Sequence, residues 1–171
     1  MNSARDIAEF LLTDLESEIP ITTAVFAAVP EDRLDYRPDS LSKTALGLVR
    51  HITLEDEWLL NSVADGQFSP VPDDSDACGL MTPQDAIRRY RERIPAAAAR
   101  VRALSAEELL RVVDLFGMIR MPAVNFLSMM LRHSVHHRGQ LSGYLRAMGG
   151  KVPSIYGPSA DTQTEVAAAA K

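Results

Sequence analysis

The strongest constraint on this fold is a repeat of apolar residues, in steps of three and four, along four long segments. This spacing places the apolar side chains on one face of a helix, because each turn takes 3.6 residues. In the first segment the face continues past Pro20 to Pro30, so we expect Pro20 to kink the helix rather than end it. That face comprises Ile7, Leu11, Leu15, Ile19, Thr22, Phe26 and Val29.

Local start and stop signals bound the other three segments. The second helix is predicted over residues 43–64. The third should begin at Thr82, a good N-cap residue, with Pro83 at the first helical position. The fourth is predicted over residues 122–148 and ends where Gly149 can adopt a left-handed cap conformation.

The connecting segments complete an all-α prediction. Residues 67–81 are rich in Pro, Asp and Ser and read as a loop, and residues 111–120 allow a brief strand or hairpin. The residues beyond position 158 lack apolar spacing, so residues 159–171 are predicted to form a loosely ordered tail. Four amphipathic helices without a convincing sheet predict a four-helix bundle over residues 1–158.

Composition narrows the class of protein. The 171 residues suit one domain, and a net charge of −5 disfavours binding to nucleic acid. No stretch approaches the roughly 18 apolar residues of a membrane span, and the N-terminus lacks the layout of a signal peptide. The single cysteine, Cys78, excludes an internal disulfide and a multi-cysteine metal site. We therefore expect a cytoplasmic protein that binds neither nucleic acid nor membranes.

The histidines are concentrated in two places. His133 and His137 lie one helical turn apart, about 40° apart around the axis, on the apolar face of the fourth helix. His136 is rotated toward the flank. His51, on the second helix, is the remaining histidine. It lies close enough to the apolar face of that helix for its ring to reach the pair on the fourth helix. This arrangement predicts a divalent metal ion held by His51, His133 and His137.

Two alternatives remain for these positions. A His-x-x-x-His pair on a helix is common in proteins that bind no metal, although three core histidines would then each need a hydrogen-bond partner. Glu55 follows His51 by one turn and should be largely buried. It could orient His51, act as a general base for water at the metal, or form a core ion pair with Arg138 or Arg132.

Gln140 lies near the inward face of the fourth helix and is expected to hydrogen-bond at the metal site. Together with Glu55 it completes the candidate catalytic residues. All-nitrogen ligation suits zinc or nickel best among the divalent ions.

The stretch His133-Ser-Val-His-His-Arg-Gly-Gln140, followed by Tyr-Gly-Pro at 156–158, resembles the DinB family of metal-binding proteins. The segment Leu46-Gly-Leu-Val-Arg-His51-Ile-Thr-Leu-Glu55 is similar to the family's second-helix motif. The aromatic residue that usually precedes the first histidine is absent here. The resemblance covers roughly residues 5–158. It implies an up-down-down-up four-helix bundle with His51, His133 and His137 as metal ligands.

The resemblance also suggests a function and an assembly. Family members with assigned activities mostly act with low-molecular-weight thiols, which implies a metal-dependent thiol S-transferase or hydrolase. The alternative is a non-enzymatic bundle that binds a metal or small ligand, for example in a stress response. A homodimer is expected from the family. Apolar residues off the main faces, namely Leu54, Leu60 and Met129, are candidates for its interface.

Overall fold

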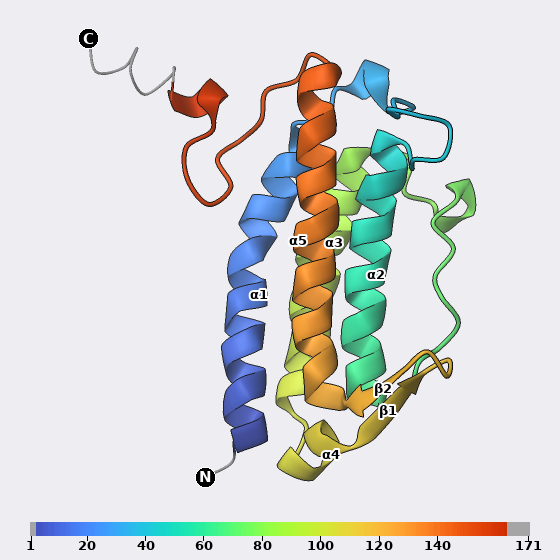
Figure 1. The fold of residues 1–171 in the computed structure, drawn as a ribbon, viewed down its shortest axis with the longest axis vertical. Coiled ribbons are helices and arrows are strands. Elements are labelled where there is room, and N and C mark those ends of the chain that lie inside the picture. Colours follow the sequence, from blue (N-terminus) through green and yellow to red (C-terminus); the bar gives the residue numbers. More distant parts are fainter. Residues whose placement is uncertain (1–2, 164–171) are drawn as a thin grey trace.

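The computed structural model describes residues 3–163 and consists mainly of four long helices lying side by side (Figure 1). These helices are α1 (Ser3–Ala27), α2 (Ala45–Asp65), α3 (Pro83–Arg102) and α5 (Ala123–Ala147). Both α1 and α2 pack against α3 and α5, so the apolar faces meet along the middle of the bundle. The predicted all-α bundle is confirmed.

The predicted helix boundaries agree with the caps in the structure. The hydroxyl of Thr82 accepts a hydrogen bond from the backbone N–H of Asp85, and the Asp85 carboxylate accepts one from the Thr82 N–H. Gly66 and Gly149 have positive φ angles of 69° and 80° at the ends of α2 and α5, where a side chain would be strained. Helix α1 continues through Pro20, as expected.

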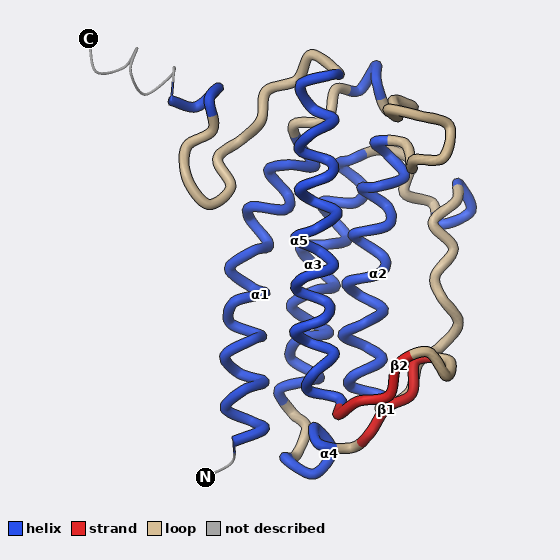
Figure 2. Tube along the Cα trace, viewed as in Figure 1, coloured by secondary structure: helices blue, strands red, loops and turns tan. Residues whose placement is uncertain are grey.

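Short elements close one end of the bundle (Figure 2). They are helix α4 (Ala106–Leu110) and an antiparallel hairpin of β1 (Val112–Leu115) and β2 (Ile119–Pro122). A capping box of Ser105 and Glu108 opens α4. Both Phe116 and Gly117 have positive φ, at 50° and 74°, in the hairpin turn. The hairpin predicted within residues 111–120 is therefore present.

The buried face of α1 differs from the prediction over its first turns. Ile7 is 50% exposed, whereas Ala4, Ala8 and Leu12 are buried. The prediction was wrong here because it weighted large apolar residues and ignored the alanines. From Leu15 onward, most of the predicted face is buried.

The residues suggested for a dimer interface lie mostly inside the bundle. Leu54 and Leu60 are buried at 6% and 0% exposure, and Met129 packs against the core. Helix α2 contacts two neighbouring helices, so its buried face is wider than the single apolar stripe read from the sequence. This part of the interface prediction was wrong.

The segment after α5 returns along the outside of the bundle (Figure 1). Residues 160–163 form a helical turn, and the Asp161 carboxylate accepts a hydrogen bond from the Val152 N–H at 2.9 Å. The rest of the predicted tail, residues 164–171, lies outside the described residues. None of the helices in residues 3–163 is long and apolar enough to cross a bilayer.

Candidate metal centre

Three histidines converge between α2 and α5. The ring centroids of His133 and His137 are 4.5 Å apart, and that of His51 lies 4.6 Å from His137 and 5.1 Å from His133. One ligand atom from each ring lies within 4.8 Å of the other two. His136 is exposed and is not part of this group. The three rings predicted from helical spacing are therefore together and can hold a metal ion.

The surroundings keep these imidazoles neutral. Burial, and to a lesser degree the charge of neighbouring histidines, lowers the pKa of both His51 and His133 to about 4. Burial also lowers the pKa of His137. A neutral imidazole has a free lone pair, which is the form that binds a metal ion.

Two of the rings have a hydrogen-bond acceptor at Nδ1. His51 Nδ1 lies 3.2 Å from Asp74 Oδ2, and His137 Nδ1 lies 3.1 Å from Gln140 Oε1. The Gln140 amide nitrogen donates to the hydroxyl of Tyr144 at 3.2 Å, which turns its oxygen toward His137. Both rings therefore carry their proton on Nδ1, and the Nε2 lone pair remains available to a metal.

The third ring has an unsatisfied nitrogen. Within residues 3–163, His133 Nδ1 is buried and has no hydrogen-bond partner. Buried polar atoms in folded proteins are nearly always paired with protein groups, water or a ligand. An unpaired nitrogen beside two oriented imidazoles fits a site that takes up a metal ion.

Glu55 lies close to the site without completing it. Its Oε1 is 3.9 Å from His51 Nδ1, which is beyond hydrogen-bonding distance. Burial and the charge of Asp74 raise the pKa of Glu55. Arg138, one of the arginines considered as its partner, forms an ion pair with Glu18 instead. Glu55 is thus a largely buried carboxylate beside the histidines, and none of the hydrogen bonds within residues 3–163 involves its oxygens.

Asp56 and the partners of Arg138 were not predicted from the sequence. Asp56 is fully buried and accepts a hydrogen bond from the Tyr90 hydroxyl at 2.7 Å. The buried Arg138 guanidinium pairs with Glu18 and donates to Thr22 at 2.9 Å. Asp56 directly follows Glu55 in the chain. Its position on the inward side of the helix was the signal in the sequence that could have identified it as buried.

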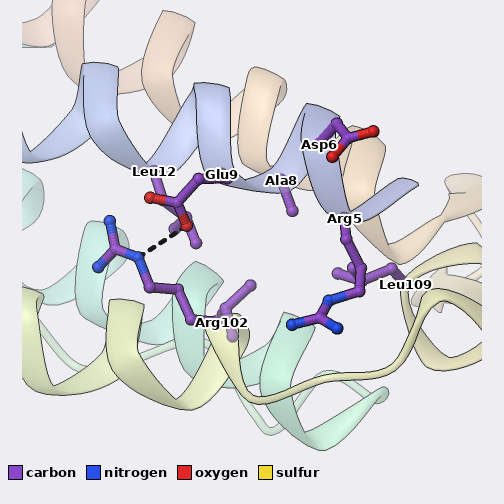
Figure 3. Close-up of a pocket in the computed structure, with 8 residues that line it drawn as sticks. Arg5, Asp6, Ala8, Glu9, Leu12, Arg102 and Leu109 are labelled. Atoms are coloured by element: carbon purple, nitrogen blue, oxygen red, sulfur yellow. Dashed lines mark hydrogen bonds and ion pairs between the residues drawn. The ribbon is translucent and has the colours of Figure 1, made fainter. Parts of the chain in front are cut away.

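A separate hollow lies between α1, α3 and α4, away from the histidines. Its volume is about 370 Å³, and its lining includes Arg5, Glu9, Arg102 and Leu109 (Figure 3). Arg102 donates to Glu9 at 3.0 Å across this hollow. Arg102 and Glu9 already neutralise one another, so this pair offers a ligand no unpaired charge at the centre of the hollow. We therefore take the histidines as the candidate site.

Comparisons with known proteins agree with this architecture. Residues 5–167 match the DinB family. The uncharacterised protein YjoA of Bacillus subtilis strain 168 is 26% identical over 132 residues, which cover 75% of this chain and 82% of that protein.

Two solved structures share the fold. The crystal structure of the DinB-like protein YjoA from Bacillus subtilis has a TM-score of 0.67 and 24% identity, and the match covers 87% of this chain and 99% of that one. A DinB-like protein from Bacillus cereus has a TM-score of 0.69 and 22% identity, and covers 86% and 97%.

Proposed function

The chain belongs to the DinB family, and on this basis we propose that it is a divalent-metal-dependent enzyme using His51, His133 and His137 as ligands. The observation that carries this proposal is the convergence of three neutral imidazoles. Three neutral ligands would leave the full charge of a bound divalent ion uncompensated and would leave room for a further ligand. That is the layout of a catalytic site rather than a closed structural one.

The chemistry follows from this ligand set. A bound zinc or nickel ion would supply a Lewis acid that favours the deprotonated form of a thiol or of water. We place S-transfer from a low-molecular-weight thiol first and hydrolysis second, because family members with assigned activities mostly use such thiols. Membership of the family supports this order by analogy.

The protein's own groups would then handle the proton and the ligands. Glu55 lies beside the histidines, and its pKa is raised. A general base works best when its pKa lies near the pH at which the enzyme operates, so the shift is in the favourable direction. We assign it the removal of a proton from the thiol or water. Gln140 contacts His137 rather than a reacting group, so we assign it the positioning of that ring.

A non-enzymatic bundle that binds a metal or small ligand is the second possibility. The side chain of His51 keeps 15% of its surface exposed, and that of Glu55 keeps 16%. This partial exposure supports the enzymatic proposal, because a purely structural site would be enclosed by packed side chains.

The test begins with metal analysis of protein purified without an affinity tag, which avoids nickel picked up from a column. The metal-loaded protein is then assayed with low-molecular-weight thiols and a chromogenic electrophile, and with ester and amide substrates. His51→Ala should abolish any activity found, whereas His136→Ala should retain it. Stoichiometric metal without turnover of either substrate class would favour the non-enzymatic alternative.

A further inference from the structure

The connection between α2 and α3 carries an acidic residue to the metal centre. This segment runs along the outside of the bundle between the two helices (Figure 1). Asp74 lies within it, and its Oδ2 atom is 3.2 Å from Nδ1 of His51. The contact joins residues separated by 23 positions, so it exists only in the folded chain.

The same connection is anchored by the residue that precedes His51. The buried guanidinium of Arg50 donates from Nε to the Leu80 carbonyl and from Nη1 to the Asp76 carboxylate, both at 2.7 Å. The two consecutive helical residues Arg50 and His51 therefore hold neighbouring parts of one loop. These hydrogen bonds limit the movement of Asp74 relative to the ring of His51.

A second side chain contacts the same carboxylate oxygen. Lys43 lies just before the N-cap of α2, and its Nζ atom is 2.5 Å from the same Oδ2 of Asp74. Within residues 3–163, the set of side chains with mutually close ligand atoms comprises the three histidines and does not include Asp74. Asp74 thus lies behind His51 and outside the set that can share one ion.

We propose that Asp74 is the positioning residue of this centre. It accepts the Nδ1–H of His51, so the ring keeps one tautomer and one direction and presents the Nε2 lone pair for metal binding. A carboxylate behind a histidine ligand also raises the basicity of the ligand nitrogen. The inference rests on the proposed three-histidine metal site. It gives Asp74 the role of orienting His51, which was one of the roles considered for Glu55 from the sequence.

Gln140 positions a second histidine ligand in the same way. Its amide oxygen accepts from His137 Nδ1 at 3.1 Å. The two acceptors differ in charge, and hydrogen bonds to an ionised acceptor are roughly twice as strong as neutral ones. Loss of the Asp74 side chain should therefore lower the zinc affinity of the site more than loss of the Gln140 side chain.

The experiment compares Asp74→Ala, Asp74→Asn and the control Asp73→Ala. Asp73 lies in the same loop and contacts the Ser75 N–H rather than His51. Zinc affinity is measured by competition with a chelating dye. The tautomer of His51 is read in the metal-free protein from histidine ring ¹⁵N spectra, which need neither metal nor activity. Cobalt-loaded samples report the ligand set through their visible absorption.

We expect Asp74→Ala to weaken zinc binding about 10- to 100-fold and to abolish the Nδ1–H preference of His51. Asp74→Asn should keep most of both, because its amide oxygen can accept the same hydrogen bond. Asp73→Ala should behave as the wild type, and the cobalt spectrum should be the same in all variants.

Two results would overturn the inference. One is an Asp74→Ala variant that matches Asp73→Ala in both zinc affinity and His51 tautomer. The other is an equal loss in Asp74→Ala and Asp74→Asn with an altered cobalt spectrum, which would make Asp74 a direct ligand. If wild-type protein binds no divalent metal at all, the proposed function fails, while the tautomer measurement still tests the Asp74–His51 contact.

Discussion

Tyr90 donates a hydrogen bond to Asp56 at 2.7 Å in the middle of the bundle, where the two residues are only 2% and 0% exposed. Burial raises the pKa of Asp56 from 3.8 to about 7. It also raises the pKa of Tyr90. Within residues 3–163 the other carboxylate oxygen, Oδ1, has no hydrogen-bond partner. The folded protein therefore holds this carboxyl group in its protonated form well above its ordinary pKa.

Replacing Asp56 with Asn should change how stability depends on pH. A group whose pKa is raised by folding contributes stability below its unfolded pKa of 3.8 and loses it as pH rises toward about 7. The loss amounts to about 1.4 kcal/mol per pH unit. Asp56→Asn does not titrate, so its stability relative to wild type should rise between about pH 5 and about pH 7.

Urea unfolding of both proteins at each pH measures this difference. Contributions from the histidines and other acids cancel in the comparison, because both proteins share them. A difference that stays constant across the range would show that Asp56 ionises normally inside the bundle.

Removing a single metal ligand should remove the metal. We expect His51→Ala, His133→Ala and His137→Ala to lose stoichiometric zinc binding, because two imidazoles seldom retain a catalytic zinc ion. His136→Ala is the matched control: its ring is 4.9 Å from that of His137 yet lies outside the group. Metal analysis of untagged protein gives the result. Loss of metal from the His136 variant instead would show that the ligand set is wrong.

Glu55→Gln should separate metal binding from chemistry. Its carboxylate is 3.9 Å from His51 Nδ1, whereas Asp74 is within hydrogen-bonding distance of that atom. We therefore expect zinc affinity to remain unchanged while turnover falls about 10²- to 10⁴-fold, as for loss of a general base. Glu57→Gln is the control, since Glu57 pairs with Arg89 on α3. Weakened zinc binding in Glu55→Gln would make Glu55 a partner of His51 instead.

Arg138→Met should destabilise the bundle strongly. The Arg138 side chain is 1% exposed and that of its partner Glu18 is 11% exposed, so the substitution leaves a carboxylate buried without its counter-charge. The expected cost is about 3–5 kcal/mol in urea unfolding. Adding Glu18→Leu should recover much of it. Arg100→Met, which breaks an exposed ion pair with Asp65, should cost less than about 1 kcal/mol.

A homodimer remains our proposal for the assembly, with a different surface from the one first considered. Phe10 and Ile7 on α1 are 72% and 50% exposed, beside a groove that includes Met121 and Val124. Sedimentation should show a dimer for the wild type and for Leu41→Ser, a change at a residue 97% exposed in a loop. Phe10→Ser should shift the protein toward monomer. A wild-type monomer at micromolar concentration would contradict the proposal.

Local features of the sequence predicted most of the elements and the histidine cluster. The spacing of His133 and His137 places them one turn apart on any α-helix, whatever packs against it. The cap at Thr82 acts within three residues and was equally predictable from the sequence. These predictions held because backbone geometry and short-range hydrogen bonds determine them before any helix meets another.

Contacts between distant segments decided the rest. Periodicity did not show that α2 would be covered on two sides, so Glu55 was taken as the buried acid although its neighbour Asp56 is the one enclosed. Asp74 reaches His51 only because the α2–α3 connection folds back along the bundle. A residue's helical phase is a local property, whereas its burial and its partner depend on which elements the tertiary fold places beside it.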